Sequence, residues 1–513
     1  MYTHRRFGHG SFRRGLLLLA GLVVAPGLAK SLAAEIDSAS WNQFHGPNGS
    51  GVAMGDGAAP VEFGLDRNML WRANLPVGHS SPCIAGGRVF VSGYEAEGKQ
   101  LSTICLDAQT GEILWTKSAT AEQIEKCHEI SNPATSTPAT DGNIVVVYFG
   151  SAGLFAYDFD GNEQWHQTLP LAKTYREFGS GTSPVVADGK VILDMQLEGN
   201  SYLVAFDIAT GQEAWKTPRP IHNKTWSTPI VWSEGESRRV GLPATARFSA
   251  YDLASGKEVW WVDGIGNQVC ATPVVDGDKI VISSAGVLGE RDNVILPPTF
   301  DEFLAQHDTD KDGKIAPSEV PDSVLIADRK AAGGAGNMPL TQILPYFADA
   351  NTKAWGRAEW DKMRESITTF RDSDLNKTNV MAVRTGGAGD VTKTHVVWQE
   401  LRGVPEVPSP LAYRNRVWMI KTGGVLTCLT ATDGKVVSQE RVGKAGGYYA
   451  SPVASGGRIY VASDYGAVTV LEAGDEFKVL AHNELPDAVL ATPAIVDGTL
   501  FVRTAKQLFA FRE

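Results

Sequence analysis

The strongest constraint on the fold is a short pattern that recurs eight times, in which proline follows serine or threonine. Consecutive copies stand 41 to 46 residues apart, except for one step of 56 and one of 137. The prolines of the eight copies are Pro82, Pro138, Pro184, Pro229, Pro273, Pro410, Pro452 and Pro493. At about 150 residues per domain, the length of the chain alone would predict three domains. A repeat of this length instead predicts a single repeat architecture.

One copy, residues 182–215, shows what each unit contains. Pro184 fixes φ and cannot donate to a sheet, which suits the entry to a strand. Asp188 and Gly189 lie between two apolar runs, a strong hairpin signal. Gly211 permits a second turn, and Trp215 follows on an outer strand. Each unit is therefore predicted to be a small antiparallel sheet.

Stacking of these units against one another buries the faces of their sheets. One small twisted sheet cannot bury both of its faces, so units of 40–45 residues pack around a common axis. Eight copies predict an all-β fold, an eight-bladed β-propeller. The last copy lacks an outer strand, whereas an isolated strand around Trp71 precedes the first copy. Pairing the two would remove a free sheet edge, so the N-terminal strand is predicted to close the last blade.

Tryptophan recurs four residues after a turn glycine in four of the repeats. The pairs are Gly111 and Trp115, Gly161 and Trp165, Gly211 and Trp215, and Gly256 and Trp260. Such regular placement could form an aromatic binding ring. Large indoles at one place on every outer strand are better explained as packing between blades.

The step of 137 residues indicates an insertion. The predicted organisation is a signal peptide at 1–33, propeller blades at 41–284, a small α-helical insertion at 285–378 and further blades at 379–513. Thr299 and Glu302 form a capping-box pattern for a helix in the insertion. A second helix is expected at 360–369.

The most specific motif lies within the insertion, at residues 308–319. Asp308, Asp310 and Asp312 supply carboxylates at loop positions 1, 3 and 5, and Glu319 supplies one at position 12. Lys314, at position 7, would contribute its backbone carbonyl. This pattern resembles the EF-hand family, and the resemblance implies one bound Ca²⁺. Residues 347–360 resemble a degenerate partner hand, with a lysine where an acid is needed.

The N-terminus resembles an export signal. Basic residues precede an apolar run at 16–28 that is too short to span a bilayer comfortably, and small residues follow it. Without this segment the chain carries 42 basic and 58 acidic side chains, a net charge of −16. That charge argues against nucleic acid as a partner. We therefore expect a periplasmic or secreted protein that does not span the membrane.

Catalytic signatures are not evident in the sequence. The five cysteines (Cys83, Cys105, Cys127, Cys270 and Cys428) include no adjacent pair and no C-x-x-C motif. They are interpreted as buried thiols, and a Cys83–Cys105 pair stays open. The histidines are scattered, and no G-x-S-x-G, H-E-x-x-H or P-loop motif occurs.

The repeat motif A-x-D-x-x-T-G-x-x-x-W, present at residues 205–215, resembles pyrroloquinoline-quinone-type β-propeller repeats. The resemblance extends over most of residues 41–513. It implies either an exported propeller like the lipoprotein of the outer-membrane assembly machinery, or a quinone-dependent alcohol dehydrogenase. The dehydrogenases clamp their quinone with a disulfide between adjacent cysteines, which this chain lacks.

Two functions follow as hypotheses. The favoured one is an exported β-propeller scaffold or interaction protein, more likely not an enzyme, that binds calcium through one EF-hand and a protein partner or small ligand at a propeller face. The alternative is a periplasmic oxidoreductase with an atypical site for pyrroloquinoline quinone. Fold analogy alone is a weak basis for assigning enzymatic activity.

Overall fold

The computed structural model describes residues 40–513 except 56, 220–223, 287–293, 328–336, 343, 345–353 and 374–376. The predicted signal peptide at 1–33 lies outside the described residues. Eight antiparallel sheets, each built from four consecutive repeat strands or their equivalents, confirm the all-β, eight-bladed propeller.

The first four blades follow each other along the chain. Blade 1 contains β2 (Cys83–Ala85), β3 (Arg88–Glu95), β4 (Gln100–Asp107) and β5 (Ile113–Thr120); blade 2 contains β6 (Ala139–Thr140), β7 (Ile144–Phe149), β8 (Gly153–Asp158) and β9 (Glu163–Gln167); blade 3 contains β10 (Val185–Ala187), β11 (Lys190–Met195), β12 (Tyr202–Asp207) and β13 (Glu213–Pro218); blade 4 contains β14 (Ile230–Glu234), β15 (Ser237–Ala244), β16 (Arg247–Asp252) and β17 (Glu258–Asp263).

The other four blades include two irregular ones. Blade 5 contains β18 (Val274–Asp276), β19 (Lys279–Ser284), β22 (Asn379–Arg384) and β24 (Val396–Glu400); blade 6 contains β25 (Leu411–Tyr413), β26 (Arg416–Lys421), β27 (Val425–Thr430) and β28 (Val436–Arg441); blade 7 contains β29 (Val453–Ser455), β30 (Arg458–Ala462), β31 (Ala467–Glu472) and β32 (Val479–Glu484); blade 8 contains β33 (Ala494–Val496), β34 (Thr499–Arg503), β35 (Gln507–Phe511) and β1 (Met69–Asn74). A short strand, β23 (Gly389–Asp390), adds a fifth strand to blade 4, parallel to β17.

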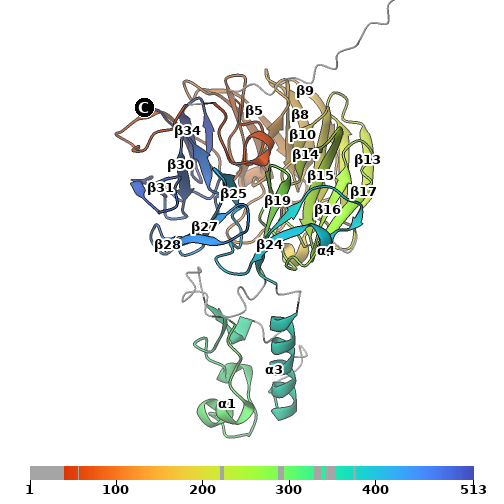
Figure 1. Cartoon of the computed structure of the whole chain (residues 1–513), viewed down its shortest axis with the longest axis vertical. Helices are drawn as coiled ribbons and strands as arrows, with labels where there is room; N and C mark the ends of the chain where they lie inside the picture. The colour runs from red at the N-terminus through yellow and green to blue at the C-terminus, as the bar shows by residue number, and fades with distance from the viewer. Residues whose placement is uncertain are drawn as a thin grey trace, which may run out of the picture. The chain divides into compact units, whose positions relative to one another are not determined.

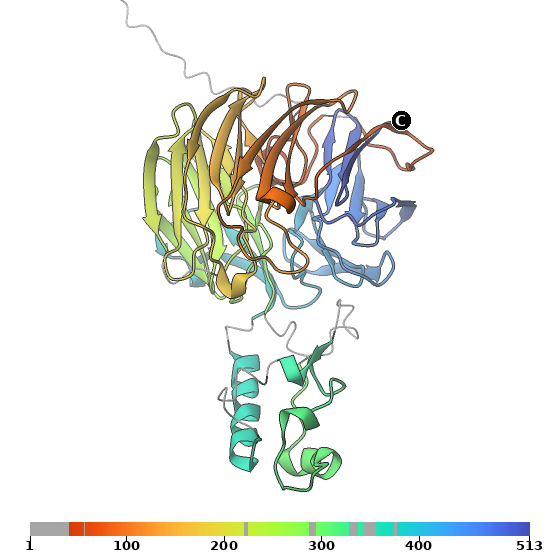
Figure 2. The same ribbon diagram turned by 180° about the vertical axis from the view of Figure 1, so that it is seen from behind.

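Blade 8 joins the two ends of the described chain. Strand β1 pairs antiparallel with β35, in a register that runs from Met69 opposite Phe511 to Asn74 opposite Gln507. The red-orange N-terminal chain accordingly lies against the blue C-terminal strands (Figure 1, Figure 2). This pairing covers the edge that β35 would otherwise expose.

The serine or threonine before each repeat proline forms a ring around the axis. From blade 1 to blade 7, its backbone N–H donates to the hydroxyl of the equivalent residue in the next blade, which gives seven bonds of 2.9–3.1 Å. The ring consists of Ser81, Thr137, Ser183, Thr228, Thr272, Ser409, Ser451 and Thr492, in blade order. The residue that marks each repeat in the sequence therefore links neighbouring blades.

The outer strands are joined by a second repeated contact. The indole N–H of Trp165 in blade 2 donates to the carbonyl of Ile208 in blade 3 at 2.7 Å. Gly211 of blade 3 lies flat against the same indole, since a Cβ there would stand 2.6 Å from the ring. Equivalent bonds are made by Trp71, Trp115, Trp215 and Trp398. These tryptophans pack between blades and do not form a binding ring.

Residues between β19 and β22 leave the propeller from the middle of blade 5. They form the helices α1 (Phe300–His307) and α3 (Arg357–Asp372), with short elements η5 (Pro317–Glu319), β20 (Leu325–Ala327), β21 (Met338–Pro339) and η6 (Leu340–Gln342). Thr299 caps α1 in a capping box with Glu302, as the sequence pattern predicts. The segment has a hydrophobic core of its own, to which Phe303, Ile315 and Trp360 belong.

The remaining short elements lie in loops of the propeller. They are η1 (Pro47–Gly49), η2 (Glu97–Lys99), η3 (Tyr175–Glu177) and α4 (Thr392–His395). Within the described residues, no helix combines the length and apolar character needed to cross a membrane.

Candidate functional site

A cavity of about 450 Å³ lies on the propeller axis. Every member of the serine and threonine ring lines it. Because each hydroxyl of the ring that accepts a backbone N–H keeps its own O–H as a donor, this part of the wall presents hydrogen-bond donors.

A second tier of the wall contains one residue from each repeat, two positions before the ring residue. Its members are His79, Thr135, Gly181, Trp226, Cys270, Val407, Tyr449 and Leu490. All eight ring positions carry a hydroxyl, whereas these eight positions carry eight different residue types. The second tier therefore makes the cavity asymmetric.

Aromatic side chains form one side of the cavity. The rings of Phe178 and Trp226 are 5.6 Å apart, and His128 meets Phe178 edge-on at 5.3 Å. The indole N–H of Trp226 donates to the carbonyl of Gly179 at 3.0 Å, which fixes the ring plane. Gly181 lies directly against Trp226, since a Cβ there would stand 2.8 Å from that of the tryptophan. We call Phe178, Trp226 and His128 the aromatic wall.

The glycine-rich segment 41–51 contributes Phe44 to the cavity from another direction. Trp41 pairs with Ile84 of blade 1, and Asn42 accepts the backbone N–H of Thr140 of blade 2. His45 contacts the carbonyl of Pro452, at the entry to blade 7, at 3.1 Å. The segment therefore contacts blades 1, 2 and 7, and its residues 47–49 also contact β14 of blade 4.

Two buried ionisable groups stand behind the cavity wall. Burial lowers the pKa of the Arg503 guanidinium to about 9, and this group donates to the carbonyl of Ser92 at 2.7 Å. Burial, and then the charge of Arg503, lower the pKa of His79 to about 4. Burial raises the pKa of Glu125 to about 7 although its carboxylate accepts from Ser180 N at 2.7 Å and Oγ at 2.8 Å. At neutral pH His79 is uncharged.

The acidic loop of the insertion brings three of its predicted ligands together. Carboxylate oxygens of Asp308, Asp310 and Asp312 all lie within 4.8 Å of one another. Asp308 Oδ1 is buried and has no hydrogen-bond partner among the described residues. Gly313 takes φ +76° and donates its N–H to Asp308 Oδ2 at 3.2 Å. An unpartnered carboxylate oxygen beside two further carboxylates fits a hard cation.

Glu319 and Lys314 lie differently from the three aspartates. Glu319 accepts from the backbone N–H groups of Thr309 at 2.7 Å and Ala316 at 2.9 Å, and it is not in the cluster of three. The backbone N–H of Lys314 donates to Asp312 Oδ1 at 2.8 Å. Ile315 pairs through both backbone bonds with Trp355, which belongs to the predicted partner hand, but 347–353 of that hand lies outside the described residues.

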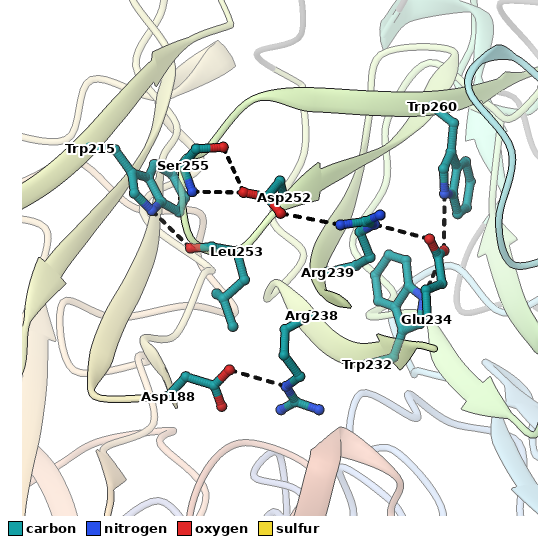
Figure 3. A network of polar contacts seen from close by, with 10 residues as sticks. All are labelled: Asp188, Trp215, Trp232, Glu234, Arg238, Arg239, Asp252, Leu253, Ser255 and Trp260. Carbon is teal, nitrogen blue, oxygen red and sulfur yellow. Dashed lines mark hydrogen bonds and ion pairs between the residues drawn. The ribbon is translucent and has the colours of Figure 1, made fainter. Parts of the chain in front are cut away.

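A polar network at the border of blades 3 and 4 serves the packing of the propeller (Figure 3). Trp260 does not use the carbonyl bond that other outer-strand tryptophans make, but donates to Glu234 Oε1 at 3.1 Å. The same oxygen accepts from Trp232 at 3.1 Å and from the backbone of Gly386 at 2.9 Å. Arg239 pairs with Glu234 Oε2 at 3.0 Å, so both oxygens of this partly buried carboxylate have partners.

The sequence did not single out the cavity residues. His79, Trp226, Cys270 and Tyr449 come from irregular loops, and only their common offset from the repeat proline relates them. Aligning the eight repeats on their prolines shows that this position carries eight different residue types, but it does not show that the position faces a cavity. All five cysteines are free thiols, so the open Cys83–Cys105 pair does not form.

Pyrroloquinoline quinone, which the fold suggests, is a flat tricarboxylate. No lysine, arginine, aspartate or glutamate is among the described residues that line the cavity. The carboxylates of the quinone would therefore meet no cationic side chain in the cavity. A metal cation bound together with the quinone would likewise meet no carboxylate of the lining. The donor set of the cavity does not fit this quinone.

Comparison with known proteins identifies one matching family. A family model described as outer membrane protein assembly factor BamB matches residues 64–260, 199–301 and 421–512. The BamB of Burkholderia pseudomallei (strain K96243) is 27% identical over 222 residues, which cover 43% of this chain and 54% of the relative. The chain thus aligns with about half the length of this curated relative.

Two solved structures share the fold. A europium-containing methanol dehydrogenase superposes with a TM-score of 0.53 at 12% identity, covering 93% of this chain and 98% of that one. The quinohemoprotein alcohol dehydrogenase from Comamonas testosteroni gives 0.52 at 14% identity, covering 92% and 80%. At such identities the likeness concerns the fold alone.

Proposed function

Because the chain belongs to the family described as outer membrane protein assembly factor BamB, we propose that it is an exported, periplasmic scaffold that binds a protein partner through a face of the propeller. The match to this family across both parts of the propeller is the observation that carries the proposal. The poor fit of the cavity to pyrroloquinoline quinone supports it over the oxidoreductase alternative.

Site-specific photocrosslinking in the native cell tests this function. A photoreactive residue replaces Ile130, an apolar residue at the cavity that is 40% exposed, and the control replaces Leu70, which is 50% exposed on the outer strand of blade 8. We expect one defined protein adduct from position 130 and none from position 70. Absence of an adduct, together with dye-linked oxidation of alcohols or sugars by the quinone-reconstituted protein, would instead support the oxidoreductase.

We further propose that the insertion is an EF-hand that binds one Ca²⁺. Asp308, Asp310 and Asp312 would hold the ion with the carbonyl of Lys314, and Glu319 would turn from its backbone contacts to complete the site. The buried, unpartnered oxygen of Asp308 supports this assignment.

Calorimetric titration with Ca²⁺ tests the assignment. We expect one site in the full chain and at least tenfold weaker binding in Asp308→Asn and Glu319→Gln, because each loses a charged ligand. Asp361→Asn, an exposed acid on α3, is the matched control and should bind as the unaltered chain does. Unchanged affinity in Glu319→Gln would contradict the EF-hand assignment.

A further inference from the structure

We propose that the central cavity binds a small, flat, uncharged aromatic molecule, and that the aromatic wall recognises its ring. The proposal does not depend on the protein-binding function proposed above, although Ile130 lies at the same cavity. It rests on three properties of the cavity: its size, the asymmetry of its second tier, and the absence of charge from its described lining.

The size of the cavity fits a small molecule. Ligand pockets in proteins typically measure about 300–1,000 Å³, and this one measures about 450 Å³. Phe44 of segment 41–51 covers part of the cavity. The space on the axis is therefore a pocket of limited size. A ligand of fused rings would fill it better than one side chain of a partner protein.

The second tier of the wall points to recognition. Neighbouring blades are linked by the repeated hydroxyl contacts of the ring residues, which are alike from blade to blade. The second tier adds nothing to that repeat, yet its eight residues all differ: the smaller Cys270 and Val407 stand between the aromatic Trp226 and Tyr449. Trp226 can occupy its place only because the neighbouring blade offers Gly181.

The polarity of the lining indicates an uncharged ligand. A charged molecule would leave water without meeting an opposite charge on the described lining. Arg503 lies behind the wall, where it donates to Ser80 and Ser92. His79 is uncharged at neutral pH, and no described residue hydrogen-bonds to its imidazole. His79 and the ring hydroxyls can therefore bond to a hydroxyl or carbonyl group on the ligand.

Three probes with the same ring and different charge test the proposal. The full chain is titrated at pH 7 with 2-naphthylmethanol, 2-naphthoate and 2-naphthylmethylammonium, and binding is followed by calorimetry. We expect the neutral alcohol to bind at least tenfold more tightly than either ion. Equal affinities, or no binding of the alcohol at millimolar concentration, would overturn the proposal.

Variants locate the site and distinguish it from unspecific binding. Trp226→Ala should weaken binding of the alcohol at least tenfold, because it removes the stacking surface. Trp261→Ala removes an indole from outside the cavity, on β17, and should leave binding unchanged. If Trp226→Ala does not fold, Leu490→Lys tests the same location. The lysine would add a positive charge to the cavity lining, so 2-naphthoate should become the most tightly bound probe. A preference unchanged by Leu490→Lys would place the binding elsewhere.

Discussion

Glu125 is a single buried carboxyl that makes the stability of this propeller depend on pH. Its carboxyl is 4% exposed and bonds only to the main chain and hydroxyl of Ser180, so burial raises its pKa from 4.5 to about 7. The unfolded chain releases this proton at lower pH than the folded chain does. Stability is therefore greatest below pH 4.5 with respect to this group and falls as the pH rises to about 7.

Glu125→Gln should remove this dependence. The expected loss in the unaltered protein, relative to the variant, is about 3 kcal/mol between pH 4.5 and 7.5, at roughly 1.4 kcal/mol per pKa unit. Urea unfolding at a series of pH values measures it. Glu122→Gln, an exposed carboxyl in the same loop, is the control. Parallel profiles for the unaltered protein and Glu125→Gln would show that the buried carboxyl does not govern the response.

At the scale of elements, the contact between an outer-strand tryptophan and the next blade's turn glycine recurs around the propeller. Gly211 and Gly189 lie in turns of blade 3 and both have φ +71°, but only Gly211 faces an indole. Gly189 has open space around its Cβ position. The two sites therefore separate the cost of backbone strain from the cost of displacing a neighbouring blade.

Gly189→Ala should cost about 1–2 kcal/mol of unfolding free energy, through strain of the left-handed backbone. Gly211→Ala should cost about 1–3 kcal/mol more, because its methyl group would overlap Trp165. Thermal and urea unfolding of the two variants measure the difference. Equal costs would mean that the indole moves freely and that the contact does not hold the blades together.

These elements also show which parts of the structure could be predicted from the sequence. Hairpins such as Asp188-Gly189 are determined locally, so the turn residues predicted the blades and the repeat predicted their number. The cavity could not be predicted in the same way, because Trp226, Phe178 and Phe44 meet only after blades distant in sequence close around the axis. Glu234 shows the same limit, since its carboxylate also accepts the backbone N–H of Gly386, which lies 152 positions further along the chain.

For the whole molecule, the ring depends on β1 completing blade 8. Ala73 is 8% exposed in this strand, while the neighbouring Arg72 points to solvent. Ala73→Asp would bury a carboxylate without a partner and should detach β1, exposing the edge of β35. We expect self-association, seen by light scattering, and faster proteolysis around residues 60–80. Arg72→Asp places the same charge on the outer face and should change neither; equal behaviour of the two variants would contradict the dependence on β1.

The pairing of β1 with β35 has a consequence for biogenesis. Asn74 and Gln507, whose side chains hydrogen-bond in the finished blade, are 433 positions apart. At about 5–20 residues per second, a ribosome takes roughly 20–90 s to make the chain between them. Throughout that interval β1 is a strand without a partner, and segment 41–51 has no blade 7 to rest on. Native closure is therefore an event that follows synthesis, and a chaperone that shields the first 75 residues would act on the step that completes the ring.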